Sequence, residues 1–258
     1  MSNGDLLAPW PQGVARHVLD RVDSTNAEAM RLAPSLSGPT WIMAREQTAG
    51  RGRRGRAWRD PQGNLAATLL IRPTGSPADA SLYSFVAALA LHEALVATCG
   101  PAARVQIKWP NDVLLNGGKV AGILLESAGQ GARVTALAIG IGVNLAAAPD
   151  PQTLEPGATP PVSVLGETGH AVTADQFLDL LAPAFARWQA QLETWGFAPI
   201  RSAWLARAAR LGQPVTARTG RDTRHGTFEG IDDSGALILT TPAGRETIPA
   251  ADIHFHEA

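Results

Sequence analysis

The sequence is short of cysteine and of the features that mark a secreted protein. Its 258 residues contain one cysteine, Cys99, so an internal disulfide framework is impossible and a zinc site built on cysteines is not expected. Cys99 lies in an apolar stretch and is interpreted as a buried small hydrophobe. The opening residues, MSNGDLLAPWPQG, have neither a basic start nor a long apolar run, so no signal peptide is predicted. A reducing cytoplasm fits these absences.

Charge is also scarce. Charged residues make up 17% of the chain and the formal net charge is −1, which argues against a general nucleic-acid coat protein. The histidines are scattered without metal-ligand spacing, and no Ser/His/Asp or Cys/His nucleophile is visible. The most apolar window, residues 80–99, carries His92 and Glu93 and is interpreted as a core helix instead of a membrane span.

The order of the predicted elements favours a mixed or antiparallel sheet. Four strands lie close together in the sequence with hairpin-length links, which a doubly wound fold would not have. Strands are predicted at 17–22, 40–46, 64–73, in a hairpin around 116–118, and at 133–145. Helices are predicted from a T-x-x-E capping box at Thr25 to Pro34, at 80–99, after a cap formed by Thr173 and Gln176, and at 200–210.

The character of the chain changes near Leu211. Short strands separated by turn residues follow it, which suggests a small β-barrel. The predicted domains are therefore residues 1–210 and 211–258. Asp150–Gly169, rich in proline and glycine, is predicted to be a loop.

A loop rich in glycine and arginine, EQTAGRGRRGRAW, follows the predicted strand 40–46. Its glycines match the dinucleotide pattern G-x-G-x-x-G, but the residues Asp60-Pro61-Gln62-Gly63 leave no room for the helix that a Rossmann turn requires. The alternative is a solvated surface loop that binds no ligand, although four arginines in six residues repel one another in water. Backbone N–H groups exposed by glycine, together with bidentate arginines, suit a phosphate or carboxylate. The loop is predicted to be disordered when empty and ordered around an anion.

Lys119 is a second candidate for holding an anion. It opens an apolar run, VAGILL. A lysine at such a position commonly extends its ammonium outward to water; the alternative is that the ammonium neutralises a bound anion. Gly122 in mid-strand indicates a bulge or a close approach to a ligand. Strict alternation puts Lys119 and Gly122 on opposite faces, so both serve one site only if the strand bulges or Gly122 acts through its backbone. The segment 109–112, Trp-Pro-Asn-Asp, is interpreted on its own as a structural turn.

Five motifs in this order resemble the biotin–protein ligases over about Val18 to Leu145. They are DSTN, GRGRRGR-x-W, KWPND, GGKVAGILLE and GIGVN. The segment GIDDSGALIL, at 230–239, resembles the small C-terminal domain of that family. Each motif is modest alone, whereas five in order are highly specific.

The resemblance implies an α+β fold. The catalytic domain is expected to resemble the class II aminoacyl-tRNA synthetases and biotin ligases, with a mixed sheet flanked by helices, followed by a small SH3-like barrel. The resemblance further implies that ATP activates biotin to biotinyl-5′-AMP, which a lysine of a biotin carboxyl carrier protein then attacks. Mg²⁺ is expected mainly on the phosphates; the resemblance assigns it no protein ligand, and Asp112 is a candidate. A cytoplasmic enzyme with no DNA or membrane partner is expected.

By the same resemblance, the site residues divide between biotin and the nucleotide. Lys119 and Arg53 are expected to be catalytic. In-line displacement at phosphorus needs charge stabilisation and positioning more than a nucleophile supplied by the protein. The residues expected to bind biotin are Ser24, Thr25, Asn26, Gln47, Gly50, Arg51, Gly52, Arg53, Lys119 and Gly122. Those expected to bind ATP or the adenylate are Arg54, Arg56, Trp58, Asp112 and Asn144, with Trp58 stacking on adenine and Asn144 bonding its edge.

Two alternatives remain at this stage. Lipoate–protein ligase shares the fold and the adenylate chemistry, although the arginine loop and KWPND favour biotin. A nucleic-acid-binding regulator would use the arginines differently, but about 22 residues precede DSTN, too few for the winged-helix domain of the repressor relatives. Relatives tend to carry a basic residue near the C-terminal end, and ETIPAADIHFHEA has no counterpart. A homodimer is considered, with a strand such as Val134–Ile139 pairing across it.

Overall fold

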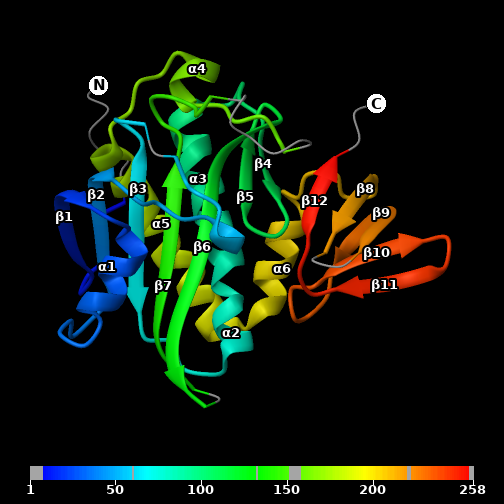
Figure 1. Ribbon diagram of the computed structural model, residues 1–258, viewed down its shortest axis with the longest axis horizontal. Helices are drawn as coiled ribbons and strands as arrows, with labels where there is room; N and C mark the ends of the chain where they lie inside the picture. Colours follow the sequence, from blue (N-terminus) through cyan, green and yellow to red (C-terminus); the bar gives the residue numbers. More distant parts are fainter. Residues whose placement is uncertain (1–7, 60, 132, 151–157, 220–221, 256–258) are drawn as a thin grey trace.

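The computed structural model describes residues 8–59, 61–131, 133–150, 158–219 and 222–255. A seven-stranded sheet with its helices forms the larger part, and a five-stranded antiparallel sheet forms the smaller part (Figure 1). The strands of the larger sheet are β1 (Ala15–Val22), β2 (Thr40–Gln47), β3 (Leu65–Ile71), β4 (Val105–Lys108), β5 (Asp112–Leu115), β6 (Gly118–Gln130) and β7 (Arg133–Val143).

The larger sheet is mixed, as the short links between strands predict. Its order is β1-β2-β3-β7-β6-β5-β4, and only the β1–β2 pair is parallel. The predicted hairpin joins β5 to β6 through Asn116 and Gly117, both with positive φ. From Leu137 onward β7 pairs with β3 on one side and β6 on the other. Leu137–Ile139, half of the segment considered for pairing across a dimer, therefore has partners on both sides already.

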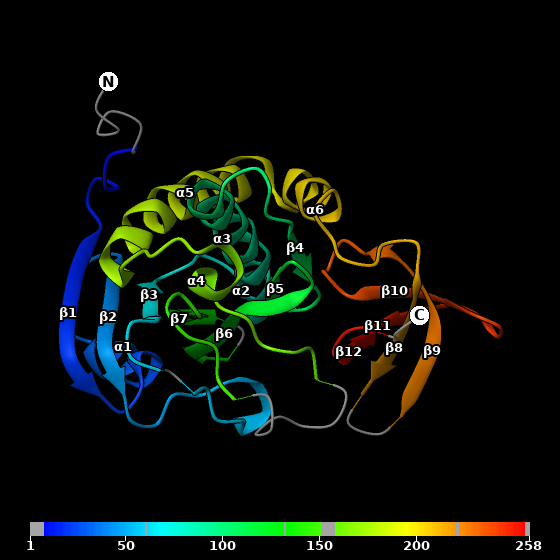
Figure 2. The same cartoon turned by 90° about the horizontal axis from the view of Figure 1, so that it is seen from above.

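The two faces of the sheet carry different side chains, and β7 shows why. Along ALAIGIGV the larger residues alternate with small ones, so Ile139 and Val143 enter the main core while Gly140 and Gly142 face the other way. On the first face lie α3 (Tyr83–Cys99), α5 (Ala174–Trp195) and α6 (Phe197–Leu205); on the second lies α1 (Thr25–Leu32) (Figure 2). The small residues leave room on the second face.

The central helix α3 is a core helix. Together with the short α2 (Pro77–Ser81) it is the one helical stretch in the described ranges long and apolar enough to cross a membrane. Eleven of its side chains, Cys99 included, are instead buried among the sheet, α5 and α6. Burial also raises the pKa of the Cys99 thiol to about 11, so it is an inert core residue, as predicted.

The helix caps were predicted with one error. Thr173 and Gln176 form the expected capping box of α5. At α1 the cap is Ser24, whose hydroxyl accepts from the backbone N–H of Ala27, so the prediction of Thr25 as the capping residue is wrong. The shift by one residue frees the Thr25 hydroxyl to point at Gln47.

The C-terminal strands form an open sheet. They are β8 (Pro214–Arg218), β9 (Thr223–Ile231), β10 (Leu237–Thr241), β11 (Gly244–Ile248) and β12 (Asp252–Phe255). Their order is β11-β10-β9-β8-β12, so β11 and β12 are the two edges among the described strands. The predicted barrel is therefore not closed. The sheet docks on the larger part where Trp109 Nε1 donates to the carbonyl of Gly235 at 2.9 Å, and its edge strand β12 faces the larger sheet (Figure 1).

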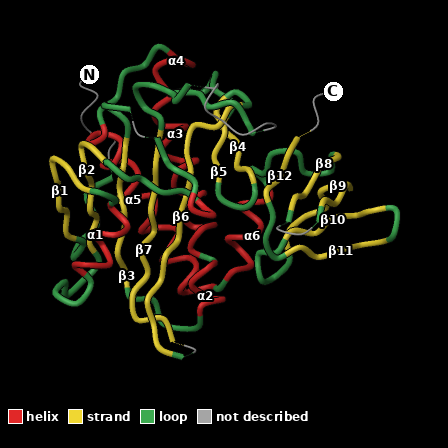
Figure 3. The backbone as a smooth tube through the Cα atoms, in the orientation of Figure 1, coloured by secondary structure: helices red, strands yellow, loops and turns green. Residues whose placement is uncertain are grey.

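Two connections surround the second face of the large sheet. The segment between β2 and β3 crosses in front of that face and holds one short 3₁₀ turn, η1 (Arg53–Gly55) (Figure 3). No helix of Rossmann type follows it in the described residues before β3, as the sequence predicts. The predicted loop at 150–169 contains α4 (Val164–Thr168), while its residues 151–157 lie outside the described part.

Candidate active site

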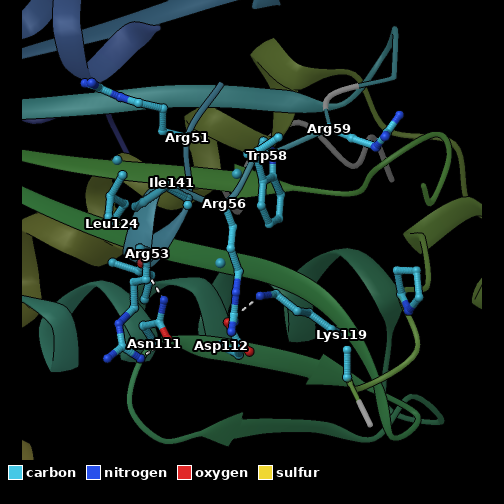
Figure 4. Close-up of a pocket in the computed structure, with 18 of the residues that line it drawn as sticks. Arg51, Arg53, Arg56, Trp58, Arg59, Asn111, Asp112, Lys119, Leu124 and Ile141 are labelled. Atoms are coloured by element: carbon cyan, nitrogen blue, oxygen red, sulfur yellow. Dashed lines mark hydrogen bonds and ion pairs between the residues drawn. The ribbon is translucent and has the colours of Figure 1, made fainter. Parts of the chain in front are cut away.

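One cavity of about 270 Å³ opens on the second face. It is bounded by the start of α1, the arginine loop, strands β5 to β7 and the edge strand β12. Figure 4 shows Arg53, Arg56, Trp58, Asp112 and Lys119 around it. Thirteen of the fifteen predicted site residues line it: Ser24, Thr25, Asn26, Gln47, Arg51, Gly52, Arg53, Arg56, Trp58, Asp112, Lys119, Gly122 and Asn144.

Gly50 and Arg54 are predicted site residues that do not line this cavity. Gly50 forms the base of the loop, where its carbonyl accepts from the N–H of Trp58 at 2.9 Å. A Cβ there would lie 2.8 Å from the Trp58 carbonyl oxygen, so glycine is required by a close approach of backbone to backbone. Arg54 has a left-handed backbone conformation and pairs with Asp252, which does line the cavity.

The neutral end of the cavity is held by buried hydrogen bonds. The Oε1 atom of Gln47 accepts from the backbone N–H of Thr25 at 2.9 Å and from its hydroxyl at 3.1 Å. Thr68 Oγ1, fully buried on β3, lies 2.8 Å from the same hydroxyl. Ser24, Thr25 and Asn26 are each at most 4% exposed, so their polar groups are fixed by the core and not by solvent.

Asn26 is the most constrained of these side chains. Its Nδ2 donates to the Leu124 carbonyl and to Glu126 Oε2, at 3.2 and 2.8 Å, while its Oδ1 accepts from Thr68 at 2.7 Å. It sits directly on Gly140, where a Cβ would lie 2.3 Å from Oδ1. The small residue on β7 is therefore what allows the amide to enter the sheet.

Asp23 fixes the start of α1 from outside. Its Oδ1 accepts from the N–H of Ser24 at 2.8 Å, and its carboxylate pairs with Arg31 at 2.6 Å. The hydrogen bond from Arg31 lowers the pKa of Asp23 to about 2. Glu28, which the sequence assigns to the capping box, forms an ion pair with the same residue, Arg31.

A bulge in β6 brings Lys119 and Gly122 to one site. Val113 pairs with Ala121 but Leu114 pairs with Lys119, so β6 carries one extra residue at this point. The alternation is broken there, and both residues line the cavity, which meets the condition set by the sequence. Lys119 Nζ lies 2.7 Å from Asp112 Oδ1 (Figure 4).

Trp58 lies inside the cavity against glycines of two strands. A Cβ on Gly142 would be 2.4 Å from its indole, and a Cβ on Gly122 would be 3.0 Å from it. Lys119 Nζ lies 5.6 Å from the centre of one indole ring. In this structure the group that rests on Gly122 is therefore the indole itself.

Three arginines of the loop converge on one carboxylate of the C-terminal sheet, while the fourth, Arg51, pairs with Glu126 at 3.2 Å. Asp252 lies 3.5, 2.8 and 3.0 Å from Arg53, Arg54 and Arg56. Its side chain is 17% exposed, so these pairs are partly withdrawn from water. Burial lowers the pKa of Arg53, and the charge of Asp252 opposes that shift. The anion that these arginines of the loop meet in this structure is the Asp252 carboxylate.

Asn144 has an unused acceptor. Its side chain is 2% exposed, and its Nδ2 donates to the Val162 carbonyl at 3.0 Å. Its Oδ1 has no hydrogen-bond partner among the residues that the structure describes. A buried carbonyl oxygen beside a cavity suits a ligand N–H donor.

Sequence reasoning missed several residues that shape the cavity. They are Thr68, Lys108, Asn111, Glu126 and Asp252. Thr68 and Lys108 had a usable signal, since each is a polar residue inside an apolar run. Asp252 had none, because it reaches the arginines from a different sheet almost 200 residues away in sequence.

Comparison with known proteins agrees with this geometry. The model of the biotin/lipoate A/B protein ligase family matches residues 18–144, and that of the biotin protein ligase C-terminal domain matches 211–255. A biotin–[acetyl-CoA-carboxylase] ligase of Paracoccus denitrificans is 71% identical over 238 residues, which cover 92% of this chain and 99% of that protein. A bifunctional ligase/repressor of Bacillus subtilis is 35% identical over 92% of this chain and 72% of its own length.

Solved structures show the same fold. The biotin protein ligase from Aquifex aeolicus, in complex with biotin and ATP, superposes with a TM-score of 0.79 at 24% identity, covering 95% of this chain and 99% of that one. The predicted biotin-ligase fold with its mixed sheet is confirmed, and the appended domain is an open antiparallel sheet in place of the predicted closed barrel. Together with a relative of 71% identity that is matched almost throughout, these matches show that the chain belongs to the biotin/lipoate A/B protein ligase family, among its biotin protein ligases.

Proposed function

We propose that this protein uses ATP to convert biotin to biotinyl-5′-AMP and then transfers biotin to a specific lysine of a carrier protein. The observation that carries the proposal is the 71% identity to a biotin–[acetyl-CoA-carboxylase] ligase over almost the whole of both chains. The cavity supports it, because buried amide and hydroxyl groups lie at one end and cations at the other.

Biotin is proposed to lie with its ureido ring at the start of α1. The ureido group has N–H donors and a carbonyl acceptor, which suit Ser24, Thr25 and Asn26. The aliphatic chain then runs past Leu124 towards the arginine loop, where Gln47, Arg51 and Gly52 border it, and it meets Gly122 once the Trp58 indole has moved off that glycine. The carboxylate thereby reaches Lys119 and Arg53.

The first step is a displacement at the α-phosphate of ATP. A carboxylate oxygen of biotin forms a bond to Pα, the bond from Pα to the bridging oxygen breaks, and pyrophosphate leaves with the electron pair. Lys119 and Arg53 are proposed to stabilise the charge on the two reacting groups. Asp112 holds the Lys119 ammonium at 2.7 Å, which orients it without removing its charge.

The adenosine end is proposed to use Trp58 and Asn144. The unused Oδ1 of Asn144 suits the amino group of adenine, and the indole offers a stacking surface. Arg56, and Arg54 from outside the cavity, are proposed to meet the nucleotide phosphates after leaving Asp252.

Magnesium fits this cavity only as an ion carried by phosphate. In the described ranges no three His, Cys, Asp or Glu side chains form a group able to hold a metal. Two carboxylates, Asp112 and Asp252, line the cavity and are the protein groups able to add one ligand each. Mg²⁺ bound to ATP would supply further charge neutralisation at the phosphates.

The proposed acceptor is the biotin carboxyl carrier domain of acetyl-CoA carboxylase or a related carboxylase. Its lysine amine attacks the acyl carbon of biotinyl-5′-AMP, an amide bond forms and AMP leaves. A cytoplasmic location, a catalytic domain of residues 1–210 and a C-terminal domain of 211–258 belong to the same proposal. A homodimer stays a prediction.

The test uses purified protein with Mg·ATP and either biotin or lipoate. We expect pyrophosphate release with biotin, followed by a mass increase of one biotin on an added carrier domain. Release with lipoate but not with biotin would instead identify the lipoate branch of the family and overturn the proposal.

A further inference from the structure

Lys108 is a buried cation that the proposed function does not use. It ends β4, lines the cavity and is 6% exposed. Its Nζ donates to Thr159 Oγ1 at 2.6 Å and lies 4.7 Å from the ring centre of Phe255. Among the described residues no carboxylate lies within ion-pair distance of it, so its charge is solvated by one hydroxyl and an aromatic face.

The contrast with Lys119 is sharp. The chain contains two lysines against twenty arginines, and both lysines line this one cavity. Lys119 has Asp112 at 2.7 Å, whereas Asp112 and Asp252 act on Lys108 only from a greater distance. Desolvation lowers the pKa of Lys108, and those two carboxylates oppose the shift. A buried ammonium without a counter-ion is costly, so an incoming anion would stabilise it.

Lys108 lies at the nucleotide end of the cavity. Its partner Thr159 belongs to the segment 159–162. In the same segment the Val162 carbonyl accepts a hydrogen bond from the Asn144 side-chain amide, and the Pro160 carbonyl accepts one from the backbone N–H of Lys119. Phe255, on the other side of Lys108, belongs to the edge strand β12 that carries Asp252. The ammonium is thus beside the proposed adenylate and away from the ring-binding residues of α1.

We propose that Lys108 binds the phosphates of ATP beyond the α-phosphate and stabilises pyrophosphate as it leaves. This inference rests on the proposed function. As the Pα–O bond breaks, its electron pair and the growing negative charge pass to the pyrophosphate oxygen, and the unpaired ammonium of Lys108 faces that charge. Lys119 and Arg53 serve the carboxylate and Pα, while Lys108 serves the leaving group.

The two half-reactions separate this role from a structural one. Pyrophosphate takes part in adenylation but not in transfer from biotinyl-5′-AMP. For Lys108→Met we expect adenylation in single turnovers to fall about 100-fold, a loss typical for one charge-stabilising donor. Transfer from supplied biotinyl-5′-AMP to the carrier domain should change less than about threefold on the same reasoning. Lys108→Arg, which keeps the charge, should restore part of the adenylation rate.

Thermal unfolding and the reverse reaction complete the test. Because Lys108→Met removes an uncompensated buried charge, its melting temperature should equal or exceed that of the wild type. More pyrophosphate should be needed to reverse adenylation. Arg104→Met, which removes one exposed charge just before β4, is the matched control and should leave both half-reactions unchanged.

Three outcomes would overturn the inference: unchanged adenylation in Lys108→Met, an equal loss in both half-reactions, or a lower melting temperature with no effect on pyrophosphate. If Lys108→Met does not fold, the same comparison is made with Lys108→Arg and Lys108→Gln. Failure of the wild type to adenylate biotin would refute the proposed function instead, before any variant is compared.

Discussion

The two ends of the cavity are built in different ways. At the ring end, neutral groups such as Thr25 and Asn26 are buried and satisfied by neighbours on β2, β3 and β6. At the phosphate end, partly exposed arginines from a loop converge on Asp252 of another sheet. The first end is preorganised by the core. The second is assembled from charges that, on the proposed function, exchange Asp252 for phosphate, so substitutions should affect the two ends in different steps.

The largest effect is expected from Lys119→Ala. Loss of the ammonium should slow adenylation about 100- to 1,000-fold, because it removes a charge that acts on the reacting atoms. Biotin binding, measured by calorimetry, should survive in part since the ring end is untouched. Unchanged adenylation kinetics would remove Lys119 from the reaction.

Gly140→Ala tests the ring end, where we expect biotin binding to be weakened and ATP binding to be kept. The new methyl group would lie 2.3 Å from Asn26 Oδ1, and Asn26 is held too firmly to move without losing a buried hydrogen bond. Such a loss costs about 1–3 kcal/mol, so we expect biotin affinity to fall about tenfold or more. ATP binding should be retained. Gly38→Ala, where the added atom meets an ordinary contact of 3.7 Å, is the control.

Arg53→Gly tests the phosphate end. The guanidinium contacts Asn111, Asp252 and the backbone carbonyl of Ala251, all of them polar groups, so we expect retention of biotinyl-5′-AMP to weaken about tenfold, the scale of one charge-assisted contact. The dissociation rate of the intermediate measures this. A matching loss of thermal stability in the free protein would contradict the assignment.

Asp252→Asn should loosen the loop without touching the ring end. Three arginines lose their shared counter-ion, so trypsin should cleave between residues 51 and 56 several times faster, and biotin with Mg·ATP should protect. The cost in stability should be about 1 kcal/mol at most, because the pairs are partly exposed. Unaltered proteolysis would show that the carboxylate does not hold the loop.

The smallest effect concerns Asp23 and acid. Its folded pKa, about 2, lies below the ordinary 3.8, so the contribution of the carboxylate is present above pH 3.8 and is lost as the pH falls towards 2. In Asp23→Asn the melting temperature should therefore fall less steeply between pH 4 and pH 2 than it does in the wild type. Equal slopes for the two proteins would exclude the Asp23–Arg31 pair as a source of acid sensitivity.

The ring end could be predicted from sequence much more completely than the phosphate end. Ser24, Thr25 and Asn26 are adjacent in the chain and belong to one motif of the family resemblance, and their neighbour Gln47 ends a strand with a clear apolar pattern. The capping residue was misplaced by one position because Ser24 and Thr25 both suit a cap.

Prediction failed where distant segments meet. The sequence shows that Lys119 and Gly122 share one site if β6 bulges, but it does not show the bulge itself. The register of a strand depends on its partner strand. Asp252 gave no local signal at all. The open C-terminal sheet was mistaken for a barrel because the strand pattern alone does not say whether the edges meet.

The scarcity of lysine has a consequence for self-modification. An acyl-adenylate acylates primary amines but not guanidinium groups under ordinary conditions. The chain carries its surface positive charge on arginine and keeps both lysines within the cavity. Biotinyl-5′-AMP that escaped would therefore find no lysine side chain of this chain outside the cavity to acylate.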